Sequence, residues 1–296
     1  MNYGAVEAGG TKMCCCVGDE NGNIIKECVI ATGSPSDTLD GIAEFFIGYC
    51  HENGICLDGI GLGWFGPINI DISSDDYGRI GNSPKVEWCG VNIISEIKKR
   101  LNGLCEDIYV TTDVNASLVG ECWLGQGKGL HDVCYITVGT GIGAGIMAGG
   151  KLVGGFSHPE FGHIGVTRVA GDKYAGCCPS HSCCFEGMAS GPSMELRWGV
   201  PASKLPDDHI GWDYEADYIA SAIVNLIFTL CPEKIILGGG VIQHPGLVSK
   251  ITDKVQYKIA GYIDLSAAGG ASNIVVMESL GGNQGMLGCI KLAMGN

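Results

Sequence analysis

A strand–glycine turn–strand pattern occurs twice in this chain, once at the N-terminus and once near the middle. The first turn is Gly9-Gly10-Thr11-Lys12, and the second begins at Gly139-Thr140-Gly141. Apolar runs flank both turns, and each turn carries a threonine among its glycines. A hairpin that recurs in this form indicates a duplicated fold, with one glycine turn at the heart of each half.

Apolar periodicity predicts the remaining elements as an alternation of strands and helices. We expect strands at Tyr3–Glu7, Met13–Val17, Ile24–Ala31, Gly59–Trp64, Tyr109–Thr112, Cys134–Val138, Ala144–Ala148, Lys234–Leu237 and Asn273–Glu278. We expect helices from Ser34 onward, at Ile93–Leu101, from Asp113 to about Leu124, at Ala216–Leu230 and at Gln284–Met294. A chain of 296 residues exceeds the usual single core, so this alternation predicts two α/β domains.

The glycine turns are candidate phosphate sites. Glycine lets the backbone approach a ligand closely, successive N–H groups can surround an anion, and the hydroxyl groups of Thr11 and Thr140 are further donors. Lys12 adds a positive charge. Gly239 and Gly240 in a third turn, and the glycines between Gly281 and Gly285, are candidate walls for an adenine ring. The alternative is that all of these turns are tight connections with no ligand.

Asp113 stands where a predicted strand meets a predicted helix, within the segment T-T-D-V-N-A-S. The partial positive charge of a helix N-terminus favours an ionised carboxylate there. Such a group can act as a general base that deprotonates a sugar hydroxyl during phosphoryl transfer. The alternative interpretation is that Asp113 only caps the helix.

The segment from Ser157 to Gly187 concentrates histidine and cysteine. Cys178, His181 and Cys184 follow the spacing C-x-x-H-x-x-C, and His163 lies upstream as a fourth ligand, which predicts a closed, structural zinc site. Cys177 and Cys183 are expected to be bystanders, because the even spacing favours their neighbours. The alternative is a surface loop in a chain that uses much cysteine.

Two carboxylates lie close in sequence to these ligands. Glu160 precedes His163 by three residues, and Glu186 follows Cys184 by two. We expect both to accept hydrogen bonds from sugar hydroxyls, and we expect loss of the metal to loosen them. ATP affinity should change less, because the glycine turns lie far away in sequence. A hydrolytic carboxylate pair is the less favoured alternative, since the phosphate turns would then have no role.

Charge and targeting signals restrict the remaining classes. A net charge of -14 without a basic stripe argues against a nucleic-acid partner. The N-terminus shows no basic segment followed by an apolar core, so a secretory signal is not expected. Among 16 cysteines, Cys14, Cys15 and Cys16 are consecutive in a predicted strand and point to opposite faces, which does not suit a disulfide framework. We therefore expect a cytoplasmic protein with reduced thiols and no membrane partner.

Together these motifs resemble the ROK family of sugar kinases and repressors. The resemblance rests on E-A-G-G-T-K at 7–12, T-D-V-N-A at 112–116 and T-V-G-T-G-I-G at 137–143. H-P-E-F-G-H at 158–163 and C-P-S-H-S-C-C-F-E-G at 178–187 resemble its bacterial fructokinase branch. The resemblance extends from about Gly4 to Gly288.

The resemblance implies an actin-like ATPase (ribonuclease H-like) fold of two α/β domains with a cleft between them. The expected domains are 1–115 with 284–296, and 116–283. It implies an ATP-dependent fructokinase that uses Mg²⁺ and a structural Zn²⁺ and forms a homodimer. The roles that it implies are the base for Asp113, sugar binding for Thr112, Glu160, His163 and Glu186, and zinc binding for His163, Cys178, His181 and Cys184. A kinase of glucose, mannose or an N-acetylated hexose and a sugar-sensing regulator are the alternatives.

Overall fold

The computed structural model describes residues 1–295, which form two compact units. Unit 1 contains Met1–Lys128, Gly154–His158 and the segment that begins at Leu280. Unit 2 contains Gly129–Val153 and Pro159–Ser279. The domain boundaries that we expected stay a prediction, but the contacts place the helix that begins at Asp113 wholly in unit 1.

Each unit is built on a five-stranded sheet, and the two sheets have the same topology. In unit 1 the strand order is β3-β2-β1-β4-β5, with β1 antiparallel to β2 and parallel to β4. In unit 2 the order is β10-β9-β6-β7-β8, with β6 antiparallel to β7 and parallel to β9. This repetition confirms the predicted duplication. The strands are β1 (Tyr3–Ala8), β2 (Lys12–Gly18), β3 (Ile24–Ala31), β4 (Gly59–Trp64), β5 (Ile108–Thr112), β6 (Val133–Val138), β7 (Ile142–Ala148), β8 (Lys151–Leu152), β9 (Lys234–Gly238) and β10 (Val275–Met277).

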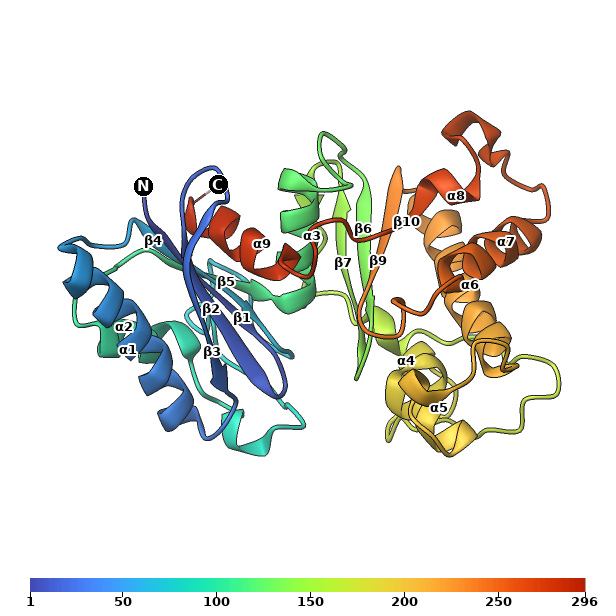
Figure 1. Ribbon diagram of the computed structural model, residues 1–296, viewed down its shortest axis with the longest axis horizontal. Coiled ribbons are helices and arrows are strands. Elements are labelled where there is room, and N and C mark those ends of the chain that lie inside the picture. Colours follow the sequence, from blue (N-terminus) through green and yellow to red (C-terminus); the bar gives the residue numbers. More distant parts are fainter. Residues whose placement is uncertain (296) are drawn as a thin grey trace. The chain divides into compact units, whose positions relative to one another are not determined.

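Helices cover these sheets (Figure 1). In unit 1, α1 and α2 share one core with the sheet, while α3 and α9 share a second core on its other face. In unit 2, α6 and α7 contact each other and contribute to a single core with the strands. The helices are α1 (Pro35–Asn53), α2 (Ile93–Leu101), α3 (Asp113–Leu124), α4 (Phe185–Ala189), α5 (Gly191–Trp198), α6 (Gly211–Leu230), α7 (Leu247–Ile259), α8 (Ala271–Ile274) and α9 (Gln284–Ala293). None of the helices described is long and apolar enough to span a membrane.

Most predicted elements occur in the structure, but helices α4, α5 and α8 and the short strand β8 were not predicted, and α6 begins at Gly211 rather than at Ala216. The strands Ile24–Ala31 and Gly59–Trp64 and the helix Ile93–Leu101 are confirmed with the same bounds. The expected strand from Asn273 was wrong at its start, because that residue lies in α8 and β10 begins only at Val275. Helix α7 was not predicted. Its sequence carries the signal, since buried apolar residues recur every four positions at Leu247, Ile251, Val255 and Ile259.

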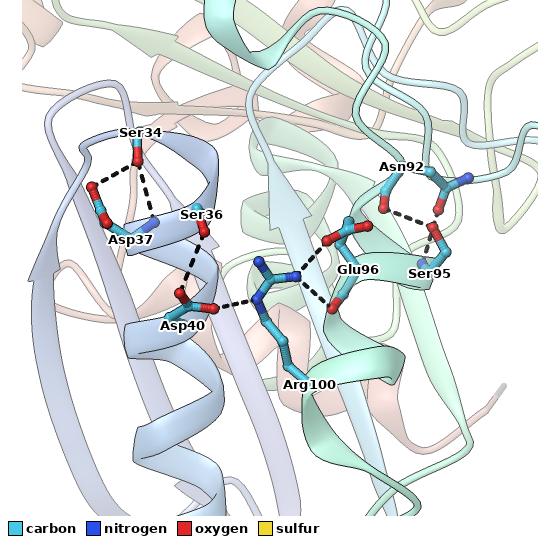
Figure 2. Close-up of polar contacts among 8 residues, drawn as sticks. All are labelled: Ser34, Ser36, Asp37, Asp40, Asn92, Ser95, Glu96 and Arg100. Atoms are coloured by element: carbon cyan, nitrogen blue, oxygen red, sulfur yellow. Dashed lines mark hydrogen bonds and ion pairs between the residues drawn. The ribbon is translucent and has the colours of Figure 1, made fainter.

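Arg100 joins the two helices that cover one face of the unit 1 sheet (Figure 2). Its Nε donates to the Asp40 carboxylate of α1 at 2.6 Å, and its Nη1 donates to the carboxylate of Glu96 on its own helix. The side chains of Ser34 and Asn92 cap α1 and α2. Because Asp40 is 54% exposed, its ion pair with Arg100 is worth about 0.2–1 kcal/mol, and the apolar core beneath supplies most of the stability.

A pocket of about 460 Å³ lies beside these two helices and is lined in part by Arg79 and Arg100. Each guanidinium is already paired with a carboxylate, Arg79 with Asp76 and Arg100 with Asp40. Glu96 also lines the pocket. The positive charge of this pocket is therefore compensated, and an anion would have to displace existing ion pairs to bind there.

The backbone of helix α9 lies in close contact with the backbones of α3 and β4. A methyl group on Gly288 of α9 would overlap the carbonyl oxygen of Ala116 in α3, and a methyl group on Gly61 of β4 would overlap the carbonyl oxygen of Cys289. These close contacts require a glycine at Gly288, where α9 meets α3, and at Gly61, where β4 meets α9. The C-terminal helix is thereby locked between a strand and a helix of unit 1.

We predict that Gly288→Ala lowers the free energy of unfolding by about 2 kcal/mol or more, because backbone atoms cannot yield to an added methyl group. Gly48→Ala in α1 is the matched control, since nothing lies within 4 Å of a methyl group at that position. It should raise the free energy of unfolding by about 0.5–1 kcal/mol through helix propensity. Chemical denaturation measures both values, and equal effects at the two glycines would contradict the packing argument.

Candidate functional site

The first glycine turn lies in unit 1 and closes the hairpin between β1 and β2. The Gly9 N–H donates to the Lys12 carbonyl at 2.9 Å, and Thr32 N–H donates to the Thr11 carbonyl at 3.0 Å. The turn is thus a tight hairpin, as in our alternative interpretation, but Gly10, Thr11 and Lys12 are exposed. An exposed turn with a lysine beside it can still receive a phosphate, so that role stays a prediction.

The second glycine turn lies in unit 2 and is held by two helices. Gly139 N–H donates to the Gly141 carbonyl at 3.0 Å, which closes the turn between β6 and β7. The Gly139 carbonyl accepts from Gly191 N–H at the start of α5 at 2.8 Å. The Glu186 carboxylate of α4 accepts from Ile142 N–H, directly after the turn, at 2.9 Å. The turn is therefore fixed from both sides.

The third glycine turn lies beside the second. Gly239 follows β9 with φ 91°, and a Cβ atom there would meet the backbone of Val138. Val241 N–H donates to the carbonyl of that same Val138, the last residue of β6, at 3.0 Å. A Cβ atom added at Gly240 would meet no other atom within 4 Å, so space for a ligand group remains there. Sequence-distant glycines at 139–141 and 239–240 thus share one edge of the unit 2 sheet.

Asp113 is the first residue of α3, where β5 ends. The helix cap is Thr112, whose buried hydroxyl accepts from Asn115 N–H at 3.2 Å. The interpretation of Asp113 as the cap was therefore wrong. One oxygen of Asp113 accepts from Val114 N–H at 2.9 Å, so the carboxylate lies at the positive end of the helix. Thr112 serves the helix in this structure, and its sugar-binding role stays a prediction.

Four predicted metal ligands come together in unit 2. The ligand atoms of His163, Cys178, His181 and Cys184 all lie within 4.8 Å of one another. Cys178 Sγ is 3.6 Å from His181 Nδ1 and 3.9 Å from His163 Nδ1, and Cys184 Sγ is 3.8 Å from His163 Nδ1. Tetrahedral zinc with ordinary bond lengths places sulfur and nitrogen ligands about 3.6 Å apart. The donor set and its spacing therefore fit Zn²⁺.

Cys177 and Cys183, the sequence neighbours of the two ligand cysteines, contact groups outside the ligand cluster. Cys183 Sγ donates to the Val166 carbonyl at 3.2 Å, and Cys177 Sγ lies 3.8 Å from the Ser190 hydroxyl. Cys184 also accepts from Gly187 N–H at 3.3 Å and caps α4. Burial raises the pKa of the Cys184 thiol to about 11, so a cation is needed to hold it as a thiolate near neutral pH.

The metal loop leads directly into the helix that carries Glu186. Because Cys184 caps α4, a metal held by that cysteine would also fix the first turn of the helix. Glu186 in turn contacts the second glycine turn through Ile142. The smaller effect of metal loss on ATP affinity that we expected from sequence distance stays a prediction, and this contact offers a route by which the metal loop could reach the second glycine turn. Glu160 precedes the short 3₁₀ turn Phe161–His163 and is exposed.

A cluster of buried polar residues contacts α4. The sequence analysis did not suggest it. Arg197 of α5 donates to the Met188 carbonyl at 2.8 Å and lies 3.3 Å from the Asp172 carboxylate. Its guanidinium lies over the Tyr218 ring at 5.3 Å. Glu215 of α6 is fully buried, and desolvation raises the pKa of its carboxyl well above the usual value. No local sequence pattern distinguishes these residues, because they meet only in three dimensions.

Comparisons with known proteins find relatives along nearly the whole chain. The family model described as "ROK family" matches residues 3–296 of this chain. A protein named "Fructokinase" from Lactococcus lactis subsp. cremoris is 42% identical over 264 residues, which cover 89% of this chain and 87% of that protein. A protein named "Fructokinase" from Pediococcus pentosaceus is 36% identical over 293 residues, covering 99% and 98%. The structure of a Streptomyces griseus ROK family glucokinase with glucose and AMPPNP shares the fold, with a TM-score of 0.76 at 24% identity over 100% of both chains.

We predict that Cys184→Ser loses zinc, with metal affinity falling about 100-fold or more, whereas Cys183→Ser keeps it. Since Glu186 connects the metal loop to the second glycine turn, Cys184→Ser should weaken both sugar and nucleotide binding. Metal analysis and separate sugar and ATP titrations on the two variants provide the measurement. Zinc lost from Cys183→Ser but retained by Cys184→Ser would show that the ligand assignment is wrong.

Proposed function

Since this chain belongs to the ROK family and is a sugar kinase, we propose that it phosphorylates D-fructose at the 6-hydroxyl with ATP. Identity of 42% and 36% to proteins named fructokinase, over most of both chains, carries this proposal. The His163, Cys178, His181 and Cys184 cluster lies in the segments that resemble the fructokinase branch.

Asp113 is the proposed general base. Its place at the start of α3 keeps the carboxylate ionised, because the helix N-terminus carries partial positive charge. The sugar hydroxyl would lose its proton to this carboxylate as its oxygen attacks the γ-phosphorus of ATP, and ADP would leave. Since phosphoryl transfer depends mostly on positioning and charge stabilisation, a modest base is sufficient.

The glycine turns are proposed to bind the nucleotide through their backbone N–H groups. Turn residues 9–12 in unit 1 and 139–141 in unit 2 offer N–H groups to phosphate oxygens, and Gly239 and Gly240 offer room for the adenosine. Mg²⁺ entering with ATP would neutralise charge on the phosphates. Glu160, His163 and Glu186 are proposed to bind sugar hydroxyls.

Zinc is proposed to act structurally. Four protein ligands would leave no open position for a substrate, so the metal would shape the loop and take no part in bond making. By fixing Cys184, it would orient α4 and the Glu186 carboxylate. The protein is also proposed to form a homodimer, as the family resemblance implies.

We predict that Asp113→Asn lowers kcat by about 10²-fold or more while sugar affinity and melting temperature stay close to those of the unsubstituted protein. Asp37→Asn is the matched control, because Asp37 also lies in the first turn of a helix but is exposed. Steady-state kinetics with fructose and ATP distinguish the two. Near-normal turnover of Asp113→Asn would show that Asp113 is not the base.

We predict that fructose has the highest kcat/KM in a panel of fructose, mannose, glucose and an N-acetylated hexose. A site that pairs with the hydroxyls of one sugar rejects an analogue that leaves buried polar groups unpaired, and this can cost about 10²-fold or more. A coupled assay for ADP compares the sugars at one ATP concentration. A higher kcat/KM for any other sugar in the panel would overturn the substrate assignment without affecting the assignment as a sugar kinase.

A further inference from the structure

Two cysteines of unit 1 lie directly opposite each other on neighbouring strands. Cys15 of β2 and Cys28 of β3 are Cα partners in the antiparallel register. Among the strand pairings of the described residues, this is the one place where cysteine faces cysteine. The proposed sugar kinase chemistry has no use for either thiol.

The geometry of this pair satisfies the requirements of a disulfide. Directly opposed residues of antiparallel strands have Cα atoms about 4.5–5.5 Å apart, within the range of about 4.4–6.8 Å that a disulfide spans. Because the two residues are directly opposed, their side chains project from the same face of the sheet. Both pack against the core under α1, whereas Cys14 and Cys16 belong to the core on the α9 side.

The two thiols differ in access. Cys15 is fully buried in a central strand, while Cys28 lies on β3 at the edge of the sheet and is partly exposed. The neighbouring Cys15 thiol, followed by the charge of Lys26, lowers the pKa of Cys28. The neighbouring Cys28 thiol and burial raise the pKa of Cys15. Solvent thus reaches the more acidic thiol first.

We propose that Cys15 and Cys28 are a dithiol redox site that closes reversibly to a disulfide when a small disulfide such as oxidised glutathione is present. The Cys28 thiolate attacks one sulfur of that molecule, forming a mixed disulfide and releasing one glutathione thiolate. Cys15 then loses its proton and attacks Cys28 Sγ, displacing the second glutathione. Two protein thiols are oxidised by two electrons, and one glutathione disulfide is reduced to two thiols.

The position of the pair gives the link a structural consequence. Lys12, which ends the first glycine turn, is three residues before Cys15, and Thr32 of the segment after β3 bonds to Thr11 in the turn. A covalent link between β2 and β3 would therefore join the two strands whose ends contact the first glycine turn. The oxidised protein is expected to melt at a higher temperature, because the link restricts the unfolded chain.

The test exposes the full-length protein to oxidised glutathione, traps remaining thiols by alkylation and maps linked peptides by mass spectrometry. Trypsin separates Cys15 from Cys28 by cleavage at Lys26. The expected result is a linked pair of peptides that is lost on reduction with dithiothreitol. The link should persist in the matched controls Cys14→Ser and Cys16→Ser, whose side chains lie on the other face of the sheet.

Two substitutions separate the roles of the thiols. Cys15→Ser should stop at a stable mixed disulfide between Cys28 and glutathione, and Cys28→Ser should leave Cys15 unmodified. Cys15→Val serves if the serine variant folds poorly, and it too should give the mixed disulfide on Cys28. A wild-type map without the Cys15–Cys28 link, or a link that forms in Cys28→Ser, would overturn the proposal. The wild-type map decides this independently of kinase activity.

Discussion

The structure depends on close contacts between backbone segments, each of which is possible only because a glycine has no Cβ atom. In unit 1, Gly61 and Gly288 let α9 lie directly on β4 and α3, so the C-terminal helix completes a core that begins with β1. In unit 2, Gly239 passes the backbone of Val138 and places the turn after β9 beside the turn after β6. Close packing of this kind tolerates no added methyl group, since backbone atoms cannot change rotamer.

The region around Glu186 shows how one short helix can connect several parts of a site. Its cap is the metal-ligand candidate Cys184, its carboxylate bonds to the residue after the second glycine turn, and its C-terminal end bonds to Arg197. The Arg197–Asp172 pair is almost fully buried, so removing either partner would leave an uncompensated charge. Metal loop, glycine turn and buried charge cluster therefore share one small element.

The three consecutive cysteines illustrate how strand geometry separates neighbours in sequence. Cys15 faces the core under α1 and meets Cys28, while Cys14 and Cys16 face the core on the α9 side. All sixteen cysteines are free thiols in this structure. Their chemistry differs by place: Cys178 and Cys184 lie in the metal-ligand cluster, whereas Cys289 donates to the carbonyl of Val6.

The sequence alone determined the alternation of elements, the duplication and the metal-ligand candidates, because strand period, glycine turns and ligand spacing are local patterns. Most predicted element bounds lie within two residues of the observed ones, and the sequence also carries the apolar period of α7, which was not predicted. Only the tertiary structure decided that Thr112 caps α3, that Glu186 contacts the second glycine turn, and that Arg197 lies beside Asp172. The Glu186 and Arg197 contacts join residues 44 and 25 positions apart, so no local pattern encodes them. The cap is a local matter, but the side-chain direction that makes Thr112 rather than Asp113 the cap is visible only in the structure.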